Sequence, residues 1–240
     1  MLNIGSLLSG VTSIKTPECM FFCKMQYGNE YFWGFLSPSD ERLENALIKK
    51  EVSIEKHQEL LSGGNIVYYN GEVFNAKDEN EYYLDENSDY QKRDSEEYNQ
   101  IIAAAKKAEL VQTLYSMKAA KAYGGIIIND LFVFETNETA RTNVVATLGS
   151  MADGDVSHWK FYTKDGTPVM QVVTKAQLFA ITSFGRAMID NCFKVEGEFL
   201  QQLEEATVEN LVSEEWVNIF TENAQNAFDA INNNMEVNLA

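Results

Sequence analysis

The sequence has few of the residues on which catalytic, metal and disulfide chemistry most often depend. It contains two histidines, three cysteines and three prolines among 240 residues. Basic residues are also scarce, since 19 Lys and Arg stand against 36 Asp and Glu, for a net charge of −17 at pH 7. A surface this acidic repels phosphate backbones and anionic lipid headgroups. The charge therefore argues against a nucleic-acid partner and against a membrane partner.

Long apolar runs and targeting signals are scarce as well. No run approaches the ~20 apolar residues of a membrane-spanning helix. The start MLNIGSLLSGVTSIK has no positively charged region before its apolar part, so we expect no signal peptide. Cys19, Cys23 and Cys192 are odd in number and match no metal or redox spacing. We therefore expect three reduced thiols in a cytoplasmic protein.

The chain does have the material for a core, because 45% of its residues are hydrophobic and 12% are aromatic. Residues 18–36 read as an aromatic hairpin that turns at Gly28-Asn29, and residues 66–74 read as a second hairpin that turns at Asn70-Gly71. Asp40 predicts the start of a helix that includes Leu43, Leu47 and Ile48. Ser53 predicts the start of another helix, which Gly63-Gly64 ends.

Residues 75–97 differ in character from the segments on either side. This stretch holds many acids, almost no aliphatic residues and several turn formers. The composition predicts a linker or an exposed loop, with binding of cations or of a basic partner as the alternative. We expect an N-terminal domain over 1–90 with the acidic linker at 75–97, a second domain over 98–212, and a C-terminal helix and polar tail over 213–240.

Residues 95–123 carry the longest helical pattern, which Gly124-Gly125 ends. A helix of this length spans ~42 Å at 1.5 Å per residue, which exceeds the diameter of a small domain. We expect it to project, to pair with another chain or to bridge the two domains. Its apolar stripe and the aromatic hairpins supply the candidate partner-binding residues, which are Trp33, Phe35, Tyr68, Tyr69, Phe74, Ile101, Leu110, Leu114 and Met117.

The remaining elements alternate hairpins with helices. Hairpins are predicted at 126–134 and 158–173, and helices at 139–152, from Thr174 onward and at 208–230. The predicted fold class is α+β, in which small antiparallel β-hairpins pack with helices and one long helix bridges two domains. This order argues against Rossmann and TIM-barrel enzymes.

Catalytic and cofactor motifs are missing from the sequence. No Gly-rich phosphate loop and no Gly-x-Ser-x-Gly elbow occurs. His57 and His158 lie in different halves, and Asp153-Gly154-Asp155 is better explained as a turn than as a calcium loop. We expect no enzyme activity, no cofactor and no metal. The aromatic groups at Trp33 and Trp159 could stack on sugars, although alternating aromatics on strands more often belong to a core.

Two segments resemble parts of bacteriophage proteins. Residues 52–74, VSIEKHQELLSGGNIVYYNGEVF, are similar to a recurring unit of tail-fibre assembly proteins. Residues 113–212 resemble the uncharacterised C-terminal domain often appended to such phage proteins, through YGGIIINDLFVFETNETART, HWKFYTKDGTPVMQVVTKAQLFAI and EEATVENL. The chain departs from that pattern at Glu135-Thr136-Asn137-Glu138, where the phage domain has Thr-Asp. The resemblance covers neither the first 50 residues nor the last 28.

The resemblance implies a tail-fibre-associated protein that binds the fibre or tail and assists its assembly or attachment without catalysis. The expected partner is a tail-fibre, tail or baseplate protein, and self-association is a further option. One alternative is a structural protein of the tail, baseplate or fibre-attachment region that is retained in the virion tail. A second alternative is a host-surface binding module.

Overall fold

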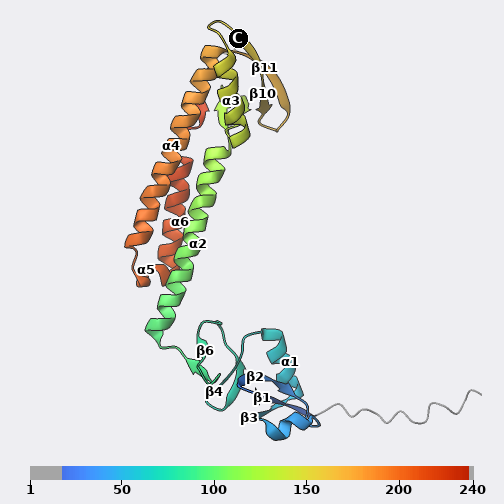
Figure 1. Cartoon of the computed structure of the whole chain (residues 1–240). Helices are drawn as coiled ribbons and strands as arrows, with labels where there is room; N and C mark the ends of the chain where they lie inside the picture. The colour runs from blue at the N-terminus through green and yellow to red at the C-terminus, as the bar shows by residue number, and fades with distance from the viewer. Residues whose placement is uncertain (1–17, 238–240) are drawn as a thin grey trace, which may run out of the picture. The chain divides into compact units, whose positions relative to one another are not determined.

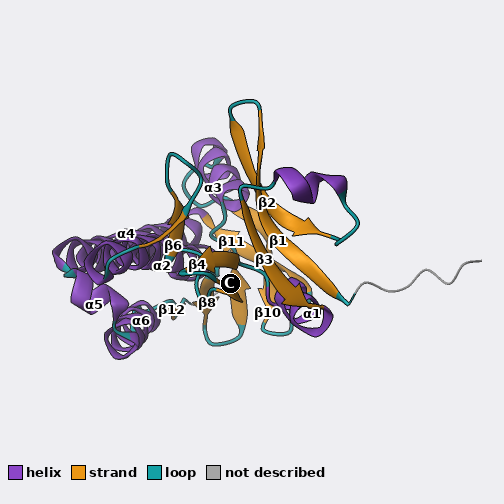
Figure 2. Ribbon diagram, turned by 90° about the horizontal axis from the view of Figure 1, so that it is seen from below, coloured by secondary structure: helices purple, strands orange, loops and turns teal. Residues whose placement is uncertain are grey.

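The computed structural model describes residues 18–237. The chain divides into two compact units, residues 1–98 and residues 99–240. Among residues 18–237, helices make up 50% and strands 27%. The fold is therefore α+β, as Figures 1 and 2 show. Each unit is described by itself below.

The first unit contains a three-stranded antiparallel sheet, two small hairpins and two short helices. The sheet has the strand order β2-β1-β3. In chain order the elements are β1 (Cys19–Tyr27), β2 (Glu30–Leu36), the 3-10 helix η1 (Glu41–Asn45), β3 (Ile48–Ser53), α1 (Ile54–Gly63), β4 (Ile66–Tyr69), β5 (Glu72–Asn75), β6 (Tyr82–Leu84) and β7 (Tyr90–Lys92).

Local sequence signals explain most of these boundaries. Asn70 and Gly71 both have positive φ, of 51° and 81°, which is the geometry of a tight hairpin turn and joins β4 to β5 as expected. The Ser53 hydroxyl accepts the Lys56 amide at 3.2 Å and so caps α1. Gly64, with φ of 77°, follows the last residue of that helix.

The structure differs from the predicted helix after Asp40. Asp40 does cap a helix, but that helix is a single 3-10 turn that ends at Asn45. Ile48, which we expected in the helix, begins strand β3 and lies opposite Lys24 of β1. The backbone of β1 pairs with residues 48–53 and holds them in an extended conformation. Pairing with a distant strand therefore overrides the local helical spacing.

The acidic stretch 75–97 is not a linker. It contains strands β6 and β7, which pair antiparallel with Tyr82 opposite Lys92. The phenol of Tyr90 donates to the Ile66 carbonyl at 3.0 Å, so the hairpin contacts β4. The carboxylates accept hydrogen bonds within the first unit, and this is why a segment with almost no aliphatic residues is folded.

The second unit joins helices to a five-stranded sheet of order β11-β10-β9-β8-β12. All pairs in this sheet are antiparallel except β12, which runs parallel to β8. In chain order the elements are α2 (Ser95–Tyr123), β8 (Ile126–Ile128), β9 (Phe132–Phe134), α3 (Glu138–Ser150), β10 (Val156–Thr163), β11 (Pro168–Thr174), α4 (Lys175–Glu205), α5 (Val208–Val212), α6 (Glu214–Asp229) and β12 (Asn234–Met235).

Helices α2, α4 and α6 lie side by side as a bundle (Figure 1). Leu110 and Leu114 of α2 are buried in one core with Phe199 of α4 and Phe220 of α6. Leu110 and Leu114 were candidates for binding a partner, and their burial in this core shows that this prediction is wrong for them. The helix is long enough to need burial along its length, and the C-terminal helices of the same chain supply it.

Residues 213–237 contribute to the same core. Phe228 of α6 is fully buried, and the side chain of Asn129 makes two hydrogen bonds with the backbone of Val237, at 2.6 and 2.7 Å. The helix expected over 208–230 is two helices, because Ser213 ends α5 and caps α6. The prediction of a separate C-terminal helix and tail is therefore wrong for residues 213–237.

Two contacts fix the position of α4 in the second unit. A Cβ on Gly185 would lie 2.7 Å from Cδ1 of Ile126, so glycine lets α4 approach β8 closely, and a larger residue would require the Ile126 side chain to shift. Farther along, the Lys118 ammonium of α2 lies 2.7 Å from the Glu196 carboxylate, and both groups are largely buried. The Lys118 ammonium also lies 4.7 Å from the centre of the Phe193 ring.

In the part of the chain that the structure describes, no helix is both long and apolar enough to span a bilayer. The three cysteines are free thiols, and Cys23 and Cys192 are buried.

The burial of the α2 stripe predicts the effect of truncating Leu114. Leu114 is 1% exposed, so Leu114→Ala should lower the free energy of unfolding by about 2–5 kcal/mol. Phe179→Ala is the control, because Phe179 of α4 is 64% exposed and its loss should cost far less. Urea unfolding followed by circular dichroism measures both. Similar small losses for the two variants would contradict the packing of α2.

Candidate functional site

Three of the aromatic residues expected to bind a partner, Trp33, Phe35 and Tyr68, are half-buried and pack against the core of the first unit. The Trp33 ring stacks on Phe22 at 5.4 Å and on Tyr68 at 5.3 Å, measured between ring centres. Phe35 lies 4.9 Å from Phe22 and 4.4 Å from the ring of His57. These side chains stabilise the unit by contacting one another. These contacts explain the positions of Trp33, Phe35 and Tyr68 within the unit.

Tyr69 and Phe74 gather around a third aromatic residue. Tyr82 of β6 lies 5.4 Å from Tyr69 and 5.6 Å from Phe74, with the rings edge to face. Both pairs join the β4–β5 hairpin to the acidic hairpin. These two candidates are half-buried, and their contacts within the unit explain their positions.

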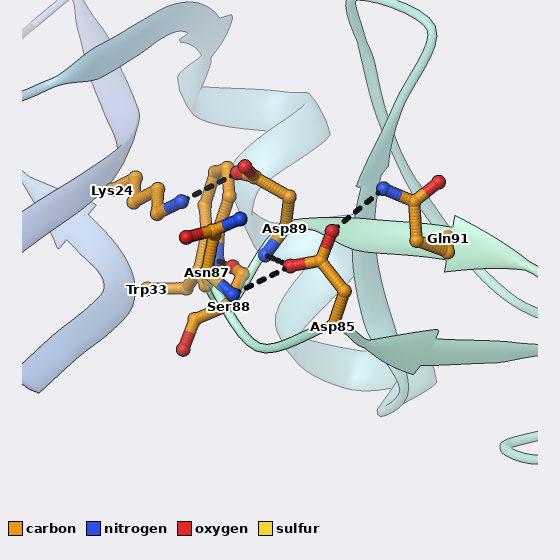
Figure 3. Close-up of polar contacts among 7 residues, drawn as sticks. All are labelled: Lys24, Trp33, Asp85, Asn87, Ser88, Asp89 and Gln91. Carbon is orange, nitrogen blue, oxygen red and sulfur yellow. Dashed lines mark hydrogen bonds and ion pairs between the residues drawn. The ribbon is translucent and has the colours of Figure 1, made fainter.

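The indole of Trp33 and the ammonium of Lys24 both reach the loop between β6 and β7. Figure 3 shows the two donors pointing at this loop. Trp33 Nε1 donates to the Ser88 carbonyl at 2.7 Å, and Lys24 Nζ lies 2.5 Å from the Asp89 carboxylate. The Lys24 side chain is buried and its ammonium also lies 4.6 Å from the Tyr31 ring centre. The buried ammonium and the half-buried indole are thus satisfied by one loop.

Asp85 holds that loop in shape (Figure 3). Its Oδ1 accepts the backbone amides of Asn87 at 2.9 Å and Asp89 at 3.0 Å, and its Oδ2 accepts the Gln91 side-chain amide at 3.0 Å. The amide of Asp89, with further help from Gln91, lowers the pKa of the Asp85 carboxyl. The loop is therefore built by hydrogen bonds to a carboxylate rather than by apolar burial.

A metal ion bound by carboxylates requires several ligand side chains arranged around it. Within residues 18–237, no group of three or more His, Cys, Asp or Glu side chains is placed to hold a metal ion. The acidic character of the segment serves the hydrogen bonds and the ion pair to Lys24 described above.

The candidates on α2 are divided between core and surface. Leu110 and Leu114 are buried, and Met117 packs against the same core. Ile101 is half-buried. The helical periodicity identifies the apolar face of α2 correctly. That face is covered by α4 and α6 of the same chain.

Sequence reasoning missed an open apolar groove in the second unit. It has a volume of about 470 Å³ and lies between α3, α4 and the β8–β9 hairpin. Ile126, Phe134 and Ile189 line its floor, and two exposed residues, Val145 of α3 and Phe193 of α4, line its edges. We call this the α3–α4 groove. Val145 follows the buried Val144 and Phe193 follows the buried Cys192, so periodicity did not distinguish either edge residue from the core beside it.

Charged groups of both signs surround the α3–α4 groove. Arg141 comes from α3, and Arg186 with Asp190 comes from α4. The Arg186 guanidinium lies 3.9 Å from the Asp190 carboxylate, and the Arg141 guanidinium lies 5.3 Å from the centre of the Tyr123 ring. An apolar hollow with a charged rim is the usual form of a protein-binding surface.

The part of the chain that holds this groove matches a known family. A family profile described as domain of unknown function, DUF4376, matches residues 96–218, which is more than half of the chain. The chain belongs to the DUF4376 family. The matched segment runs from the first turn of α2 into α6 and includes the whole α3–α4 groove. No curated protein and no solved structure matches the chain.

The DUF4376 segment includes only one of the two histidines. His158 is exposed on β10, whereas His57 of the first unit packs its ring against Phe35.

The lowered pKa of Asp85 predicts an acid-dependent contribution to stability. A carboxyl whose pKa is depressed by folding stabilises the fold above its unfolded pKa of ~3.9, and this contribution is lost as the pH falls through the folded pKa. Asp85→Asn should therefore lower the melting temperature at pH 7, and its difference from the native chain should shrink between pH 4 and pH 2. Glu86→Gln, an exposed neighbour in the same loop, is the control. A difference that stays constant with pH would contradict this role.

The pair of Lys24 and Asp89 predicts an asymmetry between its two partners. Asp89→Ala leaves a buried ammonium without its carboxylate and should destabilise the first unit by about 1–3 kcal/mol. Lys24→Met replaces the buried cation with an apolar chain of similar length and should cost less. Calorimetric melting of the two variants tests this order. An equal or larger loss for Lys24→Met would show that the ammonium itself is needed.

Proposed function

We propose that this protein is a bacteriophage tail-fibre-associated protein, which binds the fibre or tail and assists its assembly or attachment without catalysis. The observation that carries the proposal is the resemblance of residues 52–74 and 113–212 to segments of phage proteins. The first of these segments runs from the end of β3 through α1 to the β4–β5 hairpin. The second segment, residues 113–212, lies within the DUF4376 match over residues 96–218.

The assembly of a fibre gives a physical reason for such a protein. Fibres are trimeric, rich in β-structure and slow to fold, and their exposed strand edges invite misassembly. A protein that covers apolar surface during this process needs an apolar surface of its own that is already formed. We propose that the α3–α4 groove has this role, because Val145 stands at its edge with 67% of its surface exposed.

Co-expression with the fibre protein of the same phage tests the proposal. The fraction of fibre in detergent-resistant trimers should rise several-fold when this protein is present. Val145→Lys should remove most of the gain, because it places a charge at the edge of the groove. Val156→Lys is the matched control, since Val156 is an exposed valine on β10 outside the groove. Equal trimer yields with and without the protein would contradict the proposal.

Mass spectrometry of purified virions separates assembly from a permanent structural role. An assembly protein should be absent or far below the copy number of the fibre. A stoichiometric amount in the particle would replace the assembly role with that of a structural protein of the tail, baseplate or fibre-attachment region.

A further inference from the structure

Strand β2 ends the sheet of the first unit with one side open. The strand order gives it one neighbour, β1. Among residues 18–237, no backbone hydrogen bond joins β2 to any strand other than β1. One row of its N–H and C=O groups therefore faces away from the sheet, and such a row can pair with another strand.

The pairing pattern identifies the residues in the open row. The Lys24 carbonyl accepts the Leu47 amide at 2.9 Å, so the backbone groups of Lys24 point toward β3. Its cross-strand partner Trp33 must then turn its own N–H and C=O away from β1. Because the pattern repeats every second residue, Tyr31 and Phe35 present their backbone groups to the same open side.

This edge lacks the usual protection against pairing. Natural edge strands carry lysines, prolines or inward charges. Strand β11, at the edge of the other sheet, begins with Pro168, and β3 carries Lys49, Lys50 and Glu51. Strand β2 reads EYFWGFL, with one charge at its first residue. The composition of β2 therefore favours pairing with another strand.

Gly34 in the middle of β2 has no explanation within its own unit. Its φ does not lie in the left-handed region, and a Cβ added there would meet only the Met25 Cε, at an ordinary contact distance of 3.9 Å. A glycine inside a strand destabilises it by roughly 0.5–1 kcal/mol relative to alanine. A strand glycine of this kind often marks a close approach by another group.

We propose that β2 pairs antiparallel with β2 of a second copy across a two-fold axis at Trp33. Trp33 then lies opposite the partner's Trp33, and Tyr31 lies opposite the partner's Phe35. Phe32, which is 45% exposed, lies opposite the partner's Gly34 in a pair without hydrogen bonds, where side chains come closest. The aromatic ring covers the glycine, as aromatic residues do across strands in other sheets.

The two-fold register satisfies the open backbone groups and creates no clash of charge. Three hydrogen-bonded residue pairs give up to about six hydrogen bonds between the copies. The only charged residue of the strand, Glu30, lies opposite the partner's Leu36. Two three-stranded sheets thereby become one continuous antiparallel sheet with an isologous interface. Each copy carries a net charge of −17, so salt should strengthen the association.

Sedimentation equilibrium of the full-length protein tests this dimer. We expect a concentration-dependent monomer–dimer equilibrium that tightens when NaCl is raised, as for a small and weak interface. Phe32→Lys should weaken association at least tenfold, because it places like charges on the shared sheet. Leu61→Lys is the matched control, since Leu61 is 60% exposed on α1 and should leave the dimer unchanged.

Gly34→Ala separates the interface from the fold. The strand has room for this methyl group, so the melting temperature should stay level or rise, while the dimer weakens because the methyl occupies the place of the partner's Phe32. A protein that is monomeric at every concentration and salt would overturn the proposal. So would a dimer that neither Phe32→Lys nor Gly34→Ala weakens.

Discussion

The first unit depends on two donors that need acceptors, the buried Lys24 ammonium and the half-buried Trp33 indole. Both find them in the loop between β6 and β7, which is how a segment rich in acids becomes part of a folded unit. With that loop in place, the Trp33 ring contacts both Tyr68 and Tyr90. The outer edge of β2 keeps its backbone groups unpaired among the described residues.

The second unit is governed by the length of α2. A helix of 29 residues extends ~44 Å and must bury its apolar face along that length. Helices α4 and α6 do this, so the C-terminal part of the chain belongs to the same core as the DUF4376 segment. Helix α3 is shorter than its neighbours, and its seam with α4 leaves the one groove whose edges expose Val145 and Phe193.

Local chemistry could be predicted from the sequence, and distant contacts could not. Asn70-Gly71, Ser53 and Thr174 act on their immediate neighbours, and each forms the turn or cap that its type favours. The acceptor of Lys24 lies 65 residues away, so composition alone made its segment resemble a linker. Periodicity identified Leu110 and Leu114 as apolar contacts but could not say that α4 and α6 of the same chain cover them.

Hydrogen exchange of the full-length protein tests most directly whether the acidic hairpin is bound to the sheet. The account predicts that the Trp33 indole N–H and the backbone amides of Asn87 and Asp89 exchange much more slowly than in an unfolded peptide, at every protein concentration. Exchange of these three groups at unfolded rates, while the amides of β1 stay protected, would contradict it. The segment would then be the linker that its composition suggests.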